Sequence, residues 1–201
     1  MEFIIAILVG YLLGSIPFAL VIGKVFYKKD IRNYGSGNLG GGNAGRVLGK
    51  KAGVAVMTLD ILKVSFAIFI SGCLLEGEAI AVAAGLAAAI GHCFPLFARF
   101  KGGKAVATMY GFLFGMAVFG GYGLGIFFLP LIVFLIVLYI WKIIALASIC
   151  SAIFITIYVY FTTGSMAVSG ALLVFTILII VRHRKNIERM IQHKENKIKW
   201  M

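Results

Sequence analysis

Two glycine-rich segments carry the residues of this sequence that are best suited to chemistry. The first segment, residues 35–46, reads GSGNLGGGNAGR, so half of its residues are glycine. Glycine lets backbone N–H groups approach an anion closely and form a concave nest around a phosphate group. Hydrogen-bonding side chains are also present, from Ser36, Asn38, Asn43 and Arg46. The segment therefore predicts a loop that binds phosphate, and a flexible surface turn is the alternative.

Residues 35–40 also match the pattern GxGxxG of dinucleotide-binding loops. Such a site needs a β-strand directly before the loop and a βαβ unit around it. A long apolar run and a charged stretch precede residue 35 instead. The Walker spacing is absent too, because Gly45 stands too close to Gly49 and Lys50. We therefore expect no nucleotide-binding loop here.

The second segment, residues 91–108, reads GHCFPLFARFKGGKAVAT. Lys101 and Lys104 flank a pair of glycines just before a predicted helix. A helix N-terminus attracts anions through its free N–H groups and its dipole, and lysine adds a point charge for phosphate. The segment predicts a second anion-binding region, with an ordinary basic loop as the alternative. For His92, a buried structural role is the alternative to a contact with ligand.

The C-terminal tail begins with the basic stretch RHRKNIER at residues 182–189, directly after an apolar run. Anchoring to lipid headgroups is the simplest interpretation of such a stretch. Asp60 and Lys63 lie three residues apart inside another apolar run. We expect them to pair across one helical turn, which lowers the cost of two buried charges, and favour a structural role over a catalytic one.

The composition indicates that lipid is the solvent for much of this chain. Hydrophobic residues make up 62% of its 201 residues, the mean hydropathy is +1.04, and only 13% of residues are charged. Soluble domains have roughly 25% charged residues. Apolar runs near 3–26, 53–74, 79–98, 144–161 and 165–181 are each close to the ~20 residues of a membrane-spanning helix. The predicted fold class is an all-α integral membrane protein.

The distribution of basic residues predicts the topology. The net charge is +12, and every Lys and Arg except Lys63 lies in residues 24–51, 99–104, 142 or 182–199. The stretch 105–140 is too long for one ordinary span, and a turn near Gly120–Gly125 would put all four basic segments on one side. The positive-inside rule favours that arrangement. We predict seven transmembrane helices in a single polytopic domain over 1–201, with the N-terminus outside and the C-terminus cytoplasmic.

Several kinds of chemistry are not expected. Cys73, Cys93 and Cys150 have no metal-binding spacing, so neither a metal nor another cofactor is predicted. The basic charge is attributed to cytoplasmic loops and lipid headgroups, so no nucleic-acid partner is expected. The His-x4-Asp pattern of one large acyltransferase class is absent, since Phe97 follows His92 at that distance and Glu188 follows His183.

Together these segments resemble the bacterial acyl-phosphate:glycerol-3-phosphate acyltransferases, over essentially the whole chain. The resemblance rests on residues 36–46, on the GH…P…FKGGK segment at 91–104 and on the RHRxNI sequence at 182–187. It implies a seven-helix enzyme of the bacterial cytoplasmic (inner) membrane with its active site on the cytoplasmic side. The implied reaction transfers a fatty acyl group from acyl phosphate to the 1-position of sn-glycerol 3-phosphate and yields lysophosphatidic acid.

The resemblance also implies roles for individual residues. The implied catalytic residues, which would contact substrate phosphate, are Ser36, Arg46 and Lys104. The implied substrate-binding residues are Gly37, Asn38, Gly40, Asn43, His92, Lys101, Gly102, Gly103, Ser148, Arg182, His183, Asn186 and Glu195. The partners would be glycerol 3-phosphate, acyl phosphate and membrane lipid.

The chain departs from the usual family residues at a few positions. Gly41 and Gly42 stand where Ala-Thr is common, and Ala145 replaces a usual serine. Ala105 and His193 occupy positions where glycine is usual.

Direct acyl transfer, without an acyl-enzyme, is the expected mechanism. Phosphate is a good leaving group, so orientation and charge neutralisation are the main requirements. Two other function classes use the same basic face. One is a transporter of organic phosphates, which would need a pathway through the membrane midplane. The other is a non-catalytic scaffold that binds anionic lipid.

Overall fold

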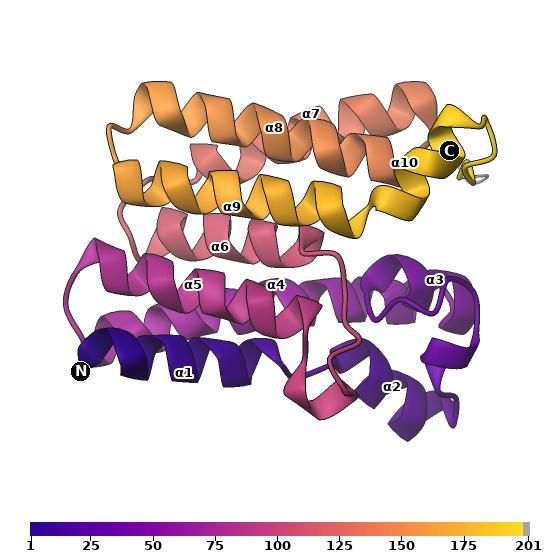
Figure 1. Ribbon diagram of the computed structural model, residues 1–201, viewed down its shortest axis with the longest axis horizontal. Coiled ribbons are helices and arrows are strands. Elements are labelled where there is room, and N and C mark those ends of the chain that lie inside the picture. Colours follow the sequence, from indigo (N-terminus) through magenta and orange to yellow (C-terminus); the bar gives the residue numbers. More distant parts are fainter. Residues whose placement is uncertain (199–201) are drawn as a thin grey trace.

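The computed structural model describes residues 1–198, and within that range the regular secondary structure is entirely helical, without a strand. The long helices lie side by side in one bundle (Figure 1). The helices are α1 (Glu2–Gly14), α2 (Phe18–Tyr27), α3 (Gly41–Leu48), α4 (Lys50–Leu74), α5 (Glu78–Cys93), α6 (Val106–Val118), α7 (Gly125–Trp141), α8 (Ile144–Thr162), α9 (Met166–Arg182) and α10 (Arg184–Ile191). The predicted all-α fold class is confirmed.

The apolar runs of the sequence correspond to these helices, except that the run 3–26 is divided into α1 and α2 by a break before Phe18. The stretch 105–140 turns between α6 and α7 as predicted. Among residues 1–198, four helical segments are long and apolar enough to cross a membrane. They are Glu2–Tyr27, Lys50–Leu74, Glu78–Ala98 and Ile144–Thr162. The pair α9 and α10, bent by 59°, would be a fifth, and α6 and α7 are apolar but shorter. Seven spans and their orientation therefore stay a prediction.

Small residues bring α1 against α5, which is distant in sequence. A Cβ on Gly10 would collide with the backbone of Ala84, and a Cβ on Gly14 would collide with the backbone of Ala88. Glycine and alanine let two helix backbones approach closely, which is how helices associate where lipid supplies no hydrophobic drive. The interface therefore depends on the absence of side chains at these positions.

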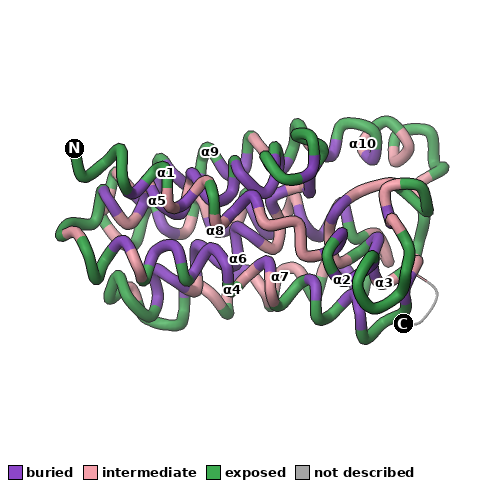
Figure 2. Tube along the Cα trace, turned by 90° about the horizontal axis from the view of Figure 1, so that it is seen from below, coloured by how far each residue is buried: buried purple, intermediate pink, exposed green. Residues whose placement is uncertain are grey.

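The interior of the bundle centres on α6, which contacts α4, α5, α7 and α9. Met109, Phe112 and Leu113 of α6 are fully buried, and the Phe112 ring packs 5.2 Å from that of Phe175 in α9. The outward faces of the other helices are exposed (Figure 2), and they carry large apolar side chains such as Phe128 of α7. An apolar exterior of this kind suits a lipid environment.

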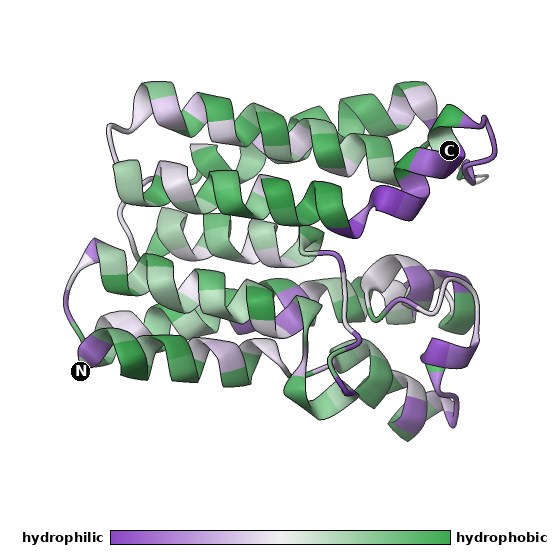
Figure 3. Cartoon of the chain, viewed as in Figure 1, coloured by the Kyte–Doolittle hydropathy of each residue, from purple (hydrophilic) through white to green (hydrophobic). Residues whose placement is uncertain are grey.

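The hydrophilic connections gather at one end of the bundle (Figure 3). That end holds α3, α10 and the segment before α6, while the N-terminus lies at the other end (Figure 1). The tail returns across this end, because the N–H of Ile198 donates to the carbonyl of Lys142 at 2.8 Å. Lys199, which was counted with the basic tail, lies outside the described residues.

Candidate functional site

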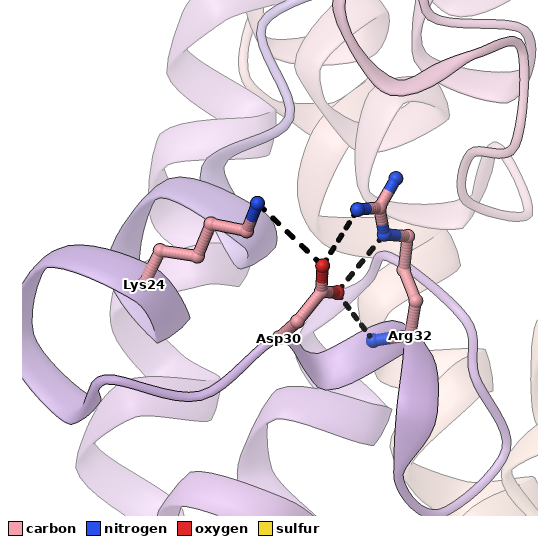
Figure 4. A network of polar contacts seen from close by, with 3 residues as sticks. All are labelled: Lys24, Asp30 and Arg32. Carbon is pink, nitrogen blue, oxygen red and sulfur yellow. Dashed lines mark hydrogen bonds and ion pairs between the residues drawn. The ribbon is translucent and has the colours of Figure 1, made fainter.

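An ion-pair network fixes the start of the first glycine-rich segment (Figure 4). Arg32 donates from Nε and Nη2 to the two carboxylate oxygens of Asp30, at 2.9 and 2.6 Å, and Lys24 lies 3.6 Å from the same carboxylate. Asp30 also accepts the backbone N–H of Arg32. The hydrogen bond from Arg32 holds the pKa of Asp30 down at about 2. The carboxylate is therefore charged at neutral pH and caps the short 3₁₀ turn Ile31–Asn33.

The buried side chain of Asn43 holds the loop together from inside. Its Oδ1 accepts the backbone N–H of Ser36 at 2.9 Å, and its Nδ2 donates to the carbonyls of Ile31 and Tyr34, both at 3.2 Å. Both of its N–H donors and its oxygen therefore bind the loop backbone. Asn43 therefore shapes the loop that presents the exposed Ser36.

The glycine-rich segment is a loop only as far as Gly40, because α3 begins at Gly41. The expectation of one continuous loop through Arg46 is wrong, and Arg46 lies near the end of α3. Glycine is a poor helix former, but here it allows α3 to pack on α4. A Cβ on Gly53 would lie 2.6 Å from the Cα of Gly45. This contact places the exposed Arg46 beside the start of α4.

The glycine pair of the second segment lies between a histidine and an arginine. On one side, the N–H of Gly103 donates to the carbonyl of His92 at 3.0 Å. On the other side, Arg182 donates from Nε to the carbonyl of Gly103 and from Nη2 to that of Gly102, both at 2.9 Å. The Arg182 guanidinium also lies over the Phe94 ring. We call residues 101–104 the glycine strap.

Lys104 joins the glycine strap to the C-terminal tail. Its Nζ donates a hydrogen bond to Oδ1 of Asn186, and Nδ2 of Asn186 donates to Glu195 at 2.6 Å. Glu195 in turn accepts from Arg189 at 2.6 Å. Burial lowers the pKa of Lys104 to about 8, and the charges of Arg189, Arg182 and Arg46 add to this effect, whereas Glu195 opposes it. The second segment and the tail therefore converge on Lys104, and α3, which carries Arg46, lies at the same end of the bundle (Figure 1).

Other predicted residues lie in different surroundings. Ser148 is fully buried and its hydroxyl donates to the carbonyl of Ile144 in its own helix at 2.8 Å. Lys101 is exposed, and His183 is buried with Nδ1 2.8 Å from the carbonyl of Ile179. Because a carbonyl only accepts, Nδ1 of His183 carries the proton and its Nε2 is free to accept.

The remaining predicted residues belong to the first loop. Gly37 has a φ of +68° and its N–H donates to the carbonyl of Tyr34 at 3.0 Å, which closes a turn before the partly buried Asn38 and Gly40. This positive φ explains a glycine at position 37.

The expected pairing of Asp60 with Lys63 is present, but the sequence did not reveal what else Lys63 contacts. Lys63 Nζ lies 2.7 Å from Asp60 and 3.1 Å from Nδ1 of His92. His92 could be predicted as a site residue because it lies near the glycine pair in the sequence. Its contact with Lys63 could not be predicted, because that contact depends on the tertiary packing of α4 against α5. Arg189, which holds Glu195, was also missed as a site residue, because it resembled one more basic residue of the tail.

Two open grooves lie elsewhere on the surface. One, of about 420 Å³, lies between α2 and α4, and the other, of about 340 Å³, lies between α8 and α9. Neither is lined by a predicted site residue. Among residues 1–198, no group of three or more His, Cys, Asp and Glu side chains is arranged to hold a metal ion.

Comparison with known proteins places this geometry in a family. Residues 4–193 match the family model described as glycerol-3-phosphate acyltransferase. The glycerol-3-phosphate acyltransferase of Geobacillus kaustophilus (strain HTA426) is 43% identical over 195 residues, which cover 96% of this chain and 95% of the relative. Glycerol-3-phosphate acyltransferase 2 of Bacillus anthracis is 44% identical over 198 residues, covering 97% and 98%.

Solved structures agree with the sequence comparison. The crystal structure of PlsY (YgiH), an integral membrane glycerol 3-phosphate acyltransferase, in its glycerol 3-phosphate form has a TM-score of 0.90 and 34% identity, covering 99% of this chain and 96% of that one. Its lysophosphatidic acid form has a TM-score of 0.88 and 33% identity over the same shares. The resemblance that rested on three motifs is confirmed: the chain belongs to the glycerol-3-phosphate acyltransferase family.

Proposed function

We propose that this protein transfers a fatty acyl group from acyl phosphate to the 1-hydroxyl of sn-glycerol 3-phosphate. The products are lysophosphatidic acid and inorganic phosphate. The names of the relatives support the acceptor, and PlsY has been solved in glycerol 3-phosphate and lysophosphatidic acid forms. The acyl-phosphate donor is part of the proposal.

One observation carries the proposal: Lys104 is held between the glycine strap and the tail, within reach of the charges of Arg46 and Arg182. Such a group of cations neutralises phosphate in both substrates. The glycerol hydroxyl attacks the acyl carbonyl, a C–O bond forms, and the bond to the leaving phosphate breaks. The departing phosphate takes the hydroxyl proton. The enzyme contributes orientation and charge stabilisation.

We further propose seven membrane spans, with the N-terminus outside and the basic end in the cytoplasm of a bacterial cell. The basic connections at one end of the bundle support this orientation. The shorter α6 and α7 have 13 and 17 residues, or about 20 and 26 Å of helix, and such lengths are accommodated by local thinning of the bilayer. The acyl chain then reaches the site laterally from the lipid.

The test uses purified protein with glycerol 3-phosphate and either acyl phosphate or acyl-CoA, and measures lysophosphatidic acid by mass. Lysophosphatidic acid is expected when acyl phosphate is the donor and not when acyl-CoA is the donor. Absence of product from acyl phosphate would exclude the proposal, and equal product from acyl-CoA would exclude the donor assignment.

Two variants test the site itself. Arg46→Ala and Lys104→Ala should each lower kcat/KM at least about 100-fold, since each removes a charge that faces phosphate. Lys185→Ala, which removes an exposed charge of α10, is the matched control and should retain turnover. Near-normal turnover of both site variants would contradict the assignment.

A further inference from the structure

A buried ion pair lies beneath the glycine strap, inside the apolar part of the bundle. Asp60 and Lys63 of α4 approach to 2.7 Å, and each side chain is only 2% exposed. Two charges removed from water are expensive, and an apolar pair of similar volume is often as stable or more stable. The pair therefore calls for an explanation other than stability.

Lys63 connects three separate parts of the chain. Besides Asp60, its Nζ contacts the carbonyl of Ile16 at 2.9 Å and Nδ1 of His92 at 3.1 Å. Ile16 lies in the break between α1 and α2, where Pro17 supplies no N–H. One ammonium group thus ties the break in the first apolar run to the end of α5.

These contacts determine which nitrogen of His92 carries its proton. A lysine ammonium has three N–H donors and no acceptor. Each donor of Lys63 has one partner here: Asp60, the carbonyl of Ile16 or Nδ1 of His92. The Nδ1 atom of His92 must then accept, so its Nε2 bears the hydrogen. The Nδ1 atom lies farther from Asp60, at 3.5 Å, which agrees with a bond to Lys63 rather than to the carboxylate.

The proton-bearing side of the His92 ring faces the glycine strap. A Cβ built on Gly103 would overlap Nε2 of His92, and the His92 carbonyl accepts the Gly103 N–H. From the opposite side, Arg182 binds the carbonyls of Gly102 and Gly103. The His92 ring thus packs directly against the glycine strap at Gly103, the residue before Lys104.

We infer that Asp60 and Lys63 are positioning residues for the acyl transfer: they fix the orientation and proton of His92, and His92 fixes the strap that presents Lys104 to the phosphate of glycerol 3-phosphate. The second half of this inference rests on the proposed function. The first half concerns only the tautomer of His92, so it can be tested without an activity measurement.

The tautomer is tested by ¹⁵N NMR of protein labelled at its histidines. The chain has only three histidines, and the signals of His92 are assigned by their loss in His92→Gln. A neutral ring protonated at Nε2 is expected, and Lys63→Met should change that pattern. A ring protonated at Nδ1, or at both nitrogens, in the unaltered protein would overturn the inference.

Kinetics test the positioning role in the Asp60→Asn/Lys63→Met double variant, which leaves no unpaired buried charge. The KM for glycerol 3-phosphate should rise at least about tenfold while the KM for the acyl donor stays within about twofold. The thermal midpoint in detergent should change little, because a neutral pair replaces the ions. Unchanged KM values would overturn the inference.

Two further variants serve as a control and as a substitute if the double variant does not fold. Ser71→Ala removes another buried polar group of α4, one without a hydrogen-bond partner among the described residues, and should leave both KM values unchanged. If the double variant does not fold, His92→Gln keeps the ion pair and should show the same rise in KM, and a normal KM would overturn the inference. Lack of product with the unaltered protein sinks the proposed function instead, while the NMR result still decides the tautomer.

Discussion

The Nζ of Lys104 donates a hydrogen bond to Oδ1 of Asn186, which lies 82 residues later in the chain. This bond joins the segment before α6 to α10, and Asn186 is itself held by Glu195. The position of the Lys104 charge is therefore determined by the tail as well as by the strap. Burial also brings the pKa of Lys104 down to about 8, close to neutrality.

The pH dependence of catalysis should report this lysine. As pH rises through about 8, Lys104 loses its charge, so kcat/KM for glycerol 3-phosphate should fall on the alkaline side. The ratio kcat/KM is the right quantity because it reports the free enzyme. Lys104→Arg should move the fall above about pH 10, since arginine keeps its charge. Lys185→Arg is the control and should keep the original profile, and an unshifted profile in Lys104→Arg would contradict this role.

Two glycine substitutions should have opposite effects. A Cβ at Gly103 would overlap the His92 ring, so Gly103→Ala should lower activity at least about tenfold and lower the thermal midpoint. Gly42 lies in α3 with no atom within 4 Å of an added Cβ. Gly42→Ala should therefore keep activity and stabilise the helix by about 0.5–1 kcal/mol. Equal effects of the two changes would argue against the packing described for the strap.

Removal of the Asn43 side chain should loosen the first loop. Asn43→Ala leaves the N–H of Ser36 and two carbonyls without this partner, at a cost of about 1–3 kcal/mol. The thermal midpoint should fall and the KM for glycerol 3-phosphate should rise. Asn33→Ala, at an exposed position of the same region, is the control and should change neither quantity. A normal midpoint for Asn43→Ala would show that the loop does not depend on this side chain.

The two positions where the family usually has glycine both have a positive φ, of 62° at Ala105 and 55° at His193. A non-glycine residue in this left-handed conformation lowers the stability of the fold by about 1–2 kcal/mol. His193 is exposed, so glycine there loses no packing, but it adds about 0.5–1 kcal/mol of chain entropy to the unfolded state. His193→Gly should therefore raise the thermal midpoint by about 1–3 °C. Ala105 is fully buried, so Ala105→Gly also loses about 0.8 kcal/mol from the burial of its methyl group. Glycine also raises the entropy of the unfolded chain, which lowers the stability of the folded state. Ala105→Gly should be nearly neutral, and a clear gain at position 105 alone would contradict this reasoning.

The sequence predicted those features that depend on local spacing. The apolar runs correspond to the helices, the stretch 105–140 turns where its glycines are, and Asp60 pairs with Lys63 across one helical turn. Each of these follows from hydropathy or from the geometry of a single helix. The glycines usual at positions 105 and 193 mark left-handed backbone, although only the coordinates reveal the φ values.

Tertiary contacts account for what the sequence did not predict. Arg46 lies on a helix because Gly53 of α4 packs against Gly45, which outweighs the poor helix propensity of glycine. Ser148 is a different case: the resemblance implies a substrate contact, but its hydroxyl is bonded locally, to the carbonyl of Ile144 in its own helix. The contact of Lys63 with His92 needs α4 and α5 to be neighbours, and nothing in the spacing of the two residues indicates this.

The close packing of Gly10 and Gly14 on α5 has a consequence for biosynthesis. The surface that receives α1 is made by Ala84 and Ala88, so it does not exist until α5 has been synthesised. Chains fold from the N-terminus as they emerge from the ribosome. The first apolar segment is therefore synthesised, together with the whole of α4, before α5, its most extensive neighbour, exists.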